Sequence, residues 1–91
     1  MGRAAPAFQS ELIRAARALL RWEQRDLANA SSVSLPTIKR LESRPGLMIA
    51  HMSTTAALKR ALETAGVEFI DENGGGPGVR LKKPPKKRGQ P

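Results

Sequence analysis

The sequence predicts a mainly α-helical domain of four helices, followed by a short C-terminal β-hairpin. Three observations support this fold class. Apolar residues recur at three- and four-residue spacing in four stretches between residues 10 and 65, as in amphipathic helices. Residues that cap or end helices separate these stretches. Beyond residue 66, β-branched and aromatic residues flank a glycine-rich run, as in a hairpin.

The first two helices are expected at about residues 10–20 and 23–30. Ser10 is a favourable N-cap for the first helix, because its hydroxyl can accept a hydrogen bond from a free backbone N–H group. Glu23 stands at the N-cap of the second helix. Asp26 in the first turn suits the positive end of the helix dipole.

The third helix is expected to begin after Ser34, another good N-cap, and to end in the segment 43–46. Pro36 is tolerated near its start because the first turn of a helix leaves its N–H groups unpaired. Ile38 and Leu41 are expected to face the core of the domain.

The fourth helix is expected at about residues 54–65, capped by Ser53 or Thr54. Residues 47–52 are apolar but contain no turn residues, so a partly packed connection is expected there. Gly66 ends the helix, as glycine commonly does one residue past the last turn.

The hairpin is expected to consist of strands 67–70 and 79–81 around the turn 71–78. Residues 1–9 are expected to be a flexible lead-in to the helical domain, which spans residues 10–66. Residues 82–91 are expected to form a disordered basic tail, because Lys, Pro, Gly and Gln cannot build a core.

The positive charge is concentrated at the C-terminus. The 91-residue chain has a net charge of +8, but six of its sixteen basic residues lie in the last fourteen positions. The charge favours a polyanionic partner. It does so mainly through the tail and not through the helical domain.

Several functional classes are disfavoured. The chain has no cysteine and one histidine, so neither a metal site nor a cofactor is expected. No acid–base pair or activated nucleophile stands out, so the protein is not expected to be an enzyme. His51 in its apolar stretch is interpreted as structural, and the glycine run as a flexible turn. Without a membrane-length apolar run or a secretory signal, a cytoplasmic protein is expected.

The strongest functional signal lies between Gln24 and Glu42. The segment contains, in order, Gln24, Leu27-Ala28, Val33-Ser34, Ile38 and Leu41-Glu42. This pattern resembles the helix-turn-helix of the Cro/phage-repressor (Xre-like) transcription regulators. The match covers about a fifth of the chain. It implies a Cro/repressor-like helix-turn-helix domain whose second motif helix lies in the major groove of DNA.

The chain departs from that family's pattern at two positions. Glycine is usual in the turn where this chain has Ser32, and Ser or Thr is usual where it has Glu23. A left-handed backbone would cost serine energy that glycine avoids, and Glu is a poorer N-cap. Both departures suggest modest stability or affinity.

The resemblance also implies which side chains face double-stranded DNA. Gln24 would bond a phosphate, Arg44 would contact the phosphate backbone, and Arg40 is the best candidate for a bidentate contact with guanine. The remaining DNA-facing residues would be Ser34, Leu35, Pro36, Thr37 and Lys39. We therefore expect a regulator, most simply a repressor or autoregulator, that binds a palindromic operator.

Three alternatives stay open at this point. The surface with Lys39 and Arg40 can be an ordinary solvated helix face. The same fold serves antitoxin or antiactivator proteins, whose partner is another protein. The basic tail can bind nucleic acid without sequence preference and with strong salt dependence, or it can serve only as a solubilising segment.

The hairpin is expected to join two subunits in a homodimer. An isolated hairpin is marginal in water, and pairing with a second subunit would complete a larger sheet. The residues expected at the interface are Val67, Phe69, Ile70, Val79 and Leu81. A two-fold dimer would present two recognition helices to a palindrome. The alternative is a hairpin that packs on its own helices.

Overall fold

The computed structural model describes residues 9–46 and 50–82. These residues form four helices and one two-stranded antiparallel sheet. In chain order the elements are α1 (Ser10–Leu20), α2 (Gln24–Ser31), α3 (Leu35–Glu42), α4 (Met52–Ala65), β1 (Val67–Ile70) and β2 (Gly78–Leu81). The predicted combination of four helices and a C-terminal hairpin is therefore confirmed. The predicted lead-in, residues 1–9, apart from Gln9, and the predicted tail beyond Lys82 lie outside the described residues.

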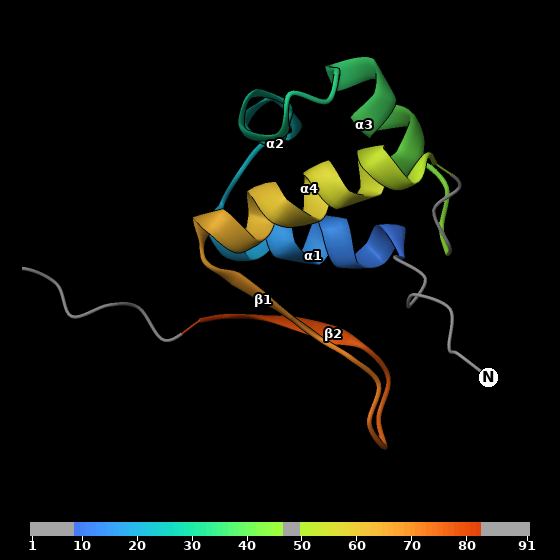
Figure 1. Cartoon of the computed structure of the whole chain (residues 1–91), viewed down its shortest axis with the longest axis vertical. Coiled ribbons are helices and arrows are strands. Elements are labelled where there is room, and N and C mark those ends of the chain that lie inside the picture. Colours follow the sequence, from blue (N-terminus) through green and yellow to red (C-terminus); the bar gives the residue numbers. More distant parts are fainter. Residues whose placement is uncertain (1–8, 47–49, 83–91) are drawn as a thin grey trace, which may run out of the picture.

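Helices α1 and α4 form the centre of the molecule (Figure 1). Helices α2 and α3 pack on one side of this pair, and the hairpin packs on the other. In the hairpin β2 lies against α1, and β1 follows α4 directly and packs against it. Helix α3 and the hairpin therefore lie on opposite sides of the molecule.

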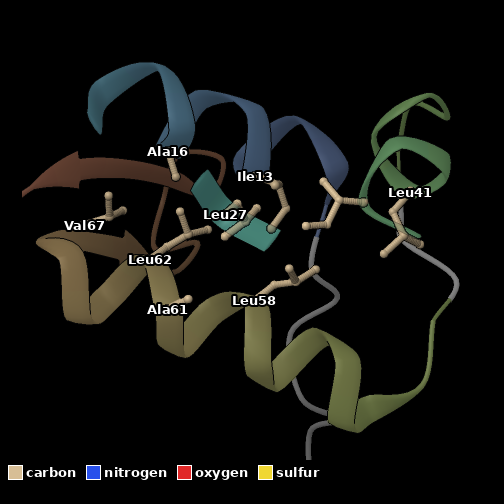
Figure 2. Packing of buried hydrophobic residues seen from close by; sticks show 9 residues of the cluster. Ile13, Ala16, Leu27, Leu41, Leu58, Ala61, Leu62 and Val67 are labelled. Carbon is tan, nitrogen blue, oxygen red and sulfur yellow. The ribbon is translucent and has the colours of Figure 1, made fainter. Parts of the chain in front are cut away.

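One apolar core holds these layers together (Figure 2). Its buried members come from every helix and from β1: Ile13, Ala16, Leu27, Ile38, Leu41, Leu58, Ala61, Leu62 and Val67. Burying one such leucine or isoleucine side chain is worth about 1.5–3 kcal/mol. Partly buried residues, among them Trp22, Val33 and Phe69, pack around this core. Ile38 and Leu41, which were expected to face the core, are both buried in it, whereas Leu19, on the apolar stretch of the first helix, is 39% exposed.

Two predicted helix starts need correction. The N-cap of α1 is Gln9, and Ser10 lies inside the helix, where its buried hydroxyl donates to the carbonyl of Arg44 at 2.6 Å. Helix α4 begins two residues earlier than predicted, at Met52, so its N-cap is His51 and neither Ser53 nor Thr54. Met52, the last residue of the segment 47–52 that was expected to be a connection, is thus the first residue of α4.

The turn between α2 and α3 contains the left-handed residue that the sequence suggested. Ser32 has φ 63° and ψ 16°, and its N–H donates to the carbonyl of Ala28 at 2.9 Å. Its side chain is exposed. The backbone energy of this conformation is therefore not offset by packing.

We expect Ser32→Gly to raise the free energy of unfolding by about 0.5–1 kcal/mol. The left-handed conformation costs a residue with a Cβ atom roughly 1–2 kcal/mol, and the greater freedom of glycine in the unfolded chain returns about half of that. Urea denaturation measures the change. Ser43→Gly is the matched control, because Ser43 is also a helix C-cap but has φ −77°. Glycine relieves nothing at position 43, so stabilisation at both positions would contradict the backbone explanation.

Candidate nucleic-acid interface

The start of α3 is fixed by a side-chain cap. The hydroxyl of Ser34 accepts a hydrogen bond from the backbone N–H of Thr37 at 3.3 Å and donates to the Thr37 hydroxyl at 2.8 Å. The N-cap predicted at Ser34 is therefore confirmed. Ile38 and Leu41 bury the opposite side of the helix. Together these contacts determine which face of α3 points outward.

The outward face of α3 carries two cations. Pro36, Lys39 and Arg40 are exposed, and a helical repeat of about 100° per residue places them away from the buried Ile38. Leu35 and Thr37 are half-buried at the edges of this face. Within residues 9–46 and 50–82, neither Lys39 nor Arg40 forms an ion pair. Both charges are therefore available to an anionic partner.

A hollow of about 420 Å³ lies beside this face and is called the α3–α4 hollow below. It is lined by Thr37, Arg40, Ala50, His51 and Thr54. The N-terminus of α4 opens here, and among the described residues no side-chain capping hydrogen bond is made by its N-cap residue, His51. The N–H groups of the first helical turn and the helix dipole favour a negative group, as does the guanidinium of Arg40. The hollow therefore has the chemistry to receive a phosphate oxygen.

Behind α3, a buried carboxylate organises a polar cluster. The side chain of Glu42 is only 4% exposed and forms two hydrogen bonds with Arg17, at 2.6 and 2.8 Å. Arg17 also donates to the carbonyl of Trp22 at 3.0 Å, and Arg14 donates to the carbonyl of Glu42 at 2.7 Å. The cluster joins α1 to α3, and it neutralises the carboxylate of Glu42.

Gln24 belongs to the same cluster. Its side-chain Nε2 donates to the carboxylate of Glu42 at 3.0 Å, and the side chain is half-buried at the start of α2. The sequence suggested a phosphate contact for this residue. The second N–H of this side-chain amide has no hydrogen bond among the described residues, so it can still donate to a phosphate. Its orientation is fixed by Glu42.

Arg44 follows α3 on an anchored loop. Its carbonyl accepts the hydrogen bond from Ser10, and the N–H of Gly46 donates to both carboxylate oxygens of Glu11 at 3.0 and 3.1 Å. Hydrogen bonds from the backbone of Glu11 itself and then from Gly46 hold the pKa of the Glu11 carboxyl below its usual value. The exposed Arg44 side chain therefore leaves a segment that α1 holds in place.

Sequence reasoning missed Arg17, Glu42 and the residues at the start of α4 as parts of this region. The signal for Glu42 was present, because it lies four residues after Ile38 and so shares the buried side of α3. Arg17 is separated from it by 25 positions in sequence, and only the fold brings the two together. The role of His51 depended on where α4 begins.

The hairpin residues predicted for a dimer interface fall into two groups. Val67 is fully buried in the core, and Phe69 and Val79 pack against that core, so these three side chains bind the chain's own helices. This is the alternative arrangement that the sequence left open. Ile70 is half-buried, and Leu81 is 49% exposed. Of the five residues, only Leu81 is exposed, so it offers the largest side-chain surface to a partner.

A second hollow lies between α2 and α4, on a different face of α4. Its volume is about 690 Å³, and Trp22 lines it together with Arg60 and small side chains from both helices. The residues that complete its lining are Ala30, Ser31, Ser53, Ala56, Ala57, Ala61, Thr64 and Ala65. We call it the α2–α4 hollow.

In the part of the chain that the structure describes, no helix is long and apolar enough to cross a membrane. The same residues contain no group of three or more His, Asp or Glu side chains arranged to hold a metal ion. Comparison with models of known protein families finds no match, and a search of curated proteins finds none either.

Proposed function

We propose that this protein is a sequence-specific DNA-binding transcription regulator with a Cro/phage-repressor type of helix-turn-helix, in which α3 is the recognition helix. One observation carries the proposal. The exposed Lys39 and Arg40 of α3 lie beside a hollow into which the N-terminus of α4 opens. A base-reading side chain and a phosphate-binding helix end thus occur on one surface.

In this proposal α3 enters the major groove. Arg40 reads guanine through its two terminal N–H groups, and Lys39 contacts a base edge or a phosphate. Thr37 offers a hydroxyl at the same edge of α3, while the apolar Pro36 suits a thymine methyl group. The α3–α4 hollow receives a backbone phosphate, which fixes the register of the helix on the duplex.

The other candidate residues contact the phosphate backbone on either side. Gln24 donates its remaining N–H from the start of α2, and Arg44 supplies a charge from the loop after α3. Glu42 lies close to this path, but Arg17 compensates its charge at 2.6 Å. The carboxylate therefore orients Gln24 and does not repel the phosphate.

The regulator acts as a homodimer, and two copies of α3 bind the two halves of a palindromic operator. It works by occupying the operator, most simply as a repressor or autoregulator. The basic tail, which lies outside the described residues except for Lys82, adds affinity that falls with salt and does not depend on sequence.

Arg40→Ala tests this proposal. A set of operator sequences is first selected with the parent protein from a random duplex pool. We expect Arg40→Ala to reduce the ratio of operator to random-DNA affinity about 5- to 150-fold, the equivalent of roughly 1–3 kcal/mol for one bidentate base contact. Fluorescence anisotropy at fixed salt measures both affinities.

The matched control is Arg60→Ala. Arg60 is also an exposed arginine without an ion pair among the described residues, but it lines the α2–α4 hollow. The Arg60→Ala substitution removes the same charge, so we expect it to lower the affinities for operator and random DNA alike and to leave their ratio unchanged. An Arg40→Ala variant that keeps the parent's ratio would contradict the role of α3.

The second candidate function is a protein-binding module of the antitoxin or antiactivator class. The α2–α4 hollow favours it, because Trp22 and small residues form an apolar surface that a partner helix can cover. The selection experiment separates the two functions. An enriched palindrome supports the regulator, and a pool without enrichment supports the protein-binding module.

A further inference from the structure

We infer that the second copy in the proposed homodimer pairs with the free edge of β2, antiparallel to it and around a two-fold axis at Arg80. This inference rests on the proposed function, which requires a dimer. The sequence predicted an interface on the face of the hairpin, but the chain's own helices cover that face. The inferred interface is instead the edge of β2 and the adjacent flank of α1.

The register of the hairpin shows which backbone groups are free. The N–H of Lys82 donates to the carbonyl of Gly66 at 2.8 Å, and Arg80 lies opposite Glu68. Hydrogen-bonded pairs alternate along an antiparallel ladder, so the N–H and C=O groups of Arg80 point toward β1. Those of Val79 and Leu81 therefore point away from β1, along the outer edge of β2. Such an edge is a template for another strand.

A two-fold axis at Arg80 uses all of these groups. It places Val79 of each copy opposite Leu81 of the other, so that each such pair exchanges two hydrogen bonds. An axis one residue earlier would place Leu81 opposite Pro77, which has no N–H to donate. The register around Arg80 is thus the one that pairs the described edge completely.

The exposed apolar side chains near this edge support the same partner. Among the described residues three large apolar side chains are exposed, and two of them are Leu81 on β2 and Leu19 on α1, at 49% and 39%. Leu19 and Arg17 are about 200° apart around α1, so Leu19 lies away from the polar cluster at α3, on a helix that also packs against β2. Pairing would cover Leu81 with Val79 of the second copy.

The charge on this strand also suits self-association. A chain with a net charge of +8 repels a copy of itself wherever unpaired cations meet. On β2, however, Arg80 forms two hydrogen bonds with the carboxylate of Glu68, at 3.1 and 3.2 Å. These bonds lower the pKa of Glu68 and raise that of Arg80, so both remain ionised and compensate each other. Two copies of β2 therefore meet as locally neutral surfaces.

A cross-linking experiment tests the register. The chain contains no cysteine, so Arg80→Cys introduces a single thiol. In the inferred pairing the two Cα atoms at position 80 form a non-hydrogen-bonded pair, about 4.5 Å apart, which fits a disulfide. Mild oxidation of the full chain should convert most of this variant to a covalent dimer, whereas the control Met52→Cys, on the far end of α4, should stay largely monomeric. Equal cross-linking of both variants would overturn the register.

A second pair of variants tests the surface without cross-linking. We expect Leu81→Lys to weaken dimerisation on the order of tenfold or more in sedimentation velocity, because a charge then lies on the paired edge. Met52→Lys adds the same charge to the third exposed apolar residue and should leave dimerisation unchanged. A parent chain that is monomeric at millimolar concentration, or a Leu81→Lys variant that dimerises as tightly as the parent, would overturn the inference.

Binding to a DNA half-site separates this inference from the function on which it rests. A folded Leu81→Lys monomer should bind a single half-site as the parent does, which circular dichroism and anisotropy can establish together. Loss of dimerisation with intact half-site binding supports the interface. A dimer that binds no selected DNA would contradict the regulator and leave the interface supported.

Discussion

Glu42→Ala is expected to lower the free energy of unfolding by about 3–5 kcal/mol, the usual cost of breaking a buried ion pair from one side. The substitution would leave Arg17, which is itself mostly buried, without its carboxylate partner. Gln24 would lose its acceptor as well. A typical small domain has only about 5–15 kcal/mol of stability in total. We therefore expect a large fall in melting temperature, measured by calorimetry or circular dichroism.

Replacing both partners provides the control. In the double variant Arg17→Met and Glu42→Leu, no charge is left without a partner, so the loss should be clearly smaller than in Glu42→Ala. Glu42→Gln keeps the shape and one acceptor oxygen and should fall between the two. If the double variant is less stable than Glu42→Ala, packing and not charge compensation explains the cluster.

The second large effect is expected at the centre of the core. Leu62 is fully buried between α1, α4 and β1, and Leu62→Ala should cost about 2–5 kcal/mol, because the cavity cannot close completely. Urea denaturation should show an earlier midpoint with an unchanged slope. The helix itself is not weakened, since alanine is the best helix former.

Met52→Ala is the matched control on the same helix. Met52 is 82% exposed, so its removal creates no cavity, and we expect a change within about 0.5 kcal/mol. A loss at position 52 comparable with that at position 62 would show that exposed apolar surface, and not the core, determines stability at α4.

Much of the fold follows from local sequence signals. The predicted helix 10–20 coincides with α1, and the predicted strand 67–70 coincides with β1. In both cases the spacing of apolar residues is regular, and a clear stop follows. The cap at Ser34 and the left-handed Ser32 were also predicted, because each depends on the chemistry of one residue and its immediate neighbours.

The features that sequence reasoning missed depend on contacts between distant residues. Ser10 looked like an N-cap, but the loop after α3 takes its hydroxyl, and that loop is 34 positions away. His51 became the N-cap of α4 although Ser53 and Thr54 are better capping residues. Glu42 looked like one of several scattered acids until α1 placed Arg17 beside it.

The candidate interface divides in the same way. The outward position of Lys39 and Arg40 was predictable from the period of α3, and the structure places both residues there. The α3–α4 hollow was not predictable, because it depends on where α4 begins and how it approaches α3. For the hairpin, the sequence gives the strands but not the face that its own helices cover.

A backbone hydrogen bond at Gly66 determines where a label after β2 would lie. Because Lys82 is hydrogen-bonded to the carbonyl of Gly66, the chain after β2 departs from the C-terminal end of α4. A helix of 14 residues separates this point from the α3–α4 hollow by about 21 Å. The chain before Gln9, in contrast, departs beside Gly46, whose carbonyl accepts the N–H of Ser10, and so close to Arg44. A label attached directly after Lys82 would therefore start farther from the α3–α4 hollow than one attached before Gln9.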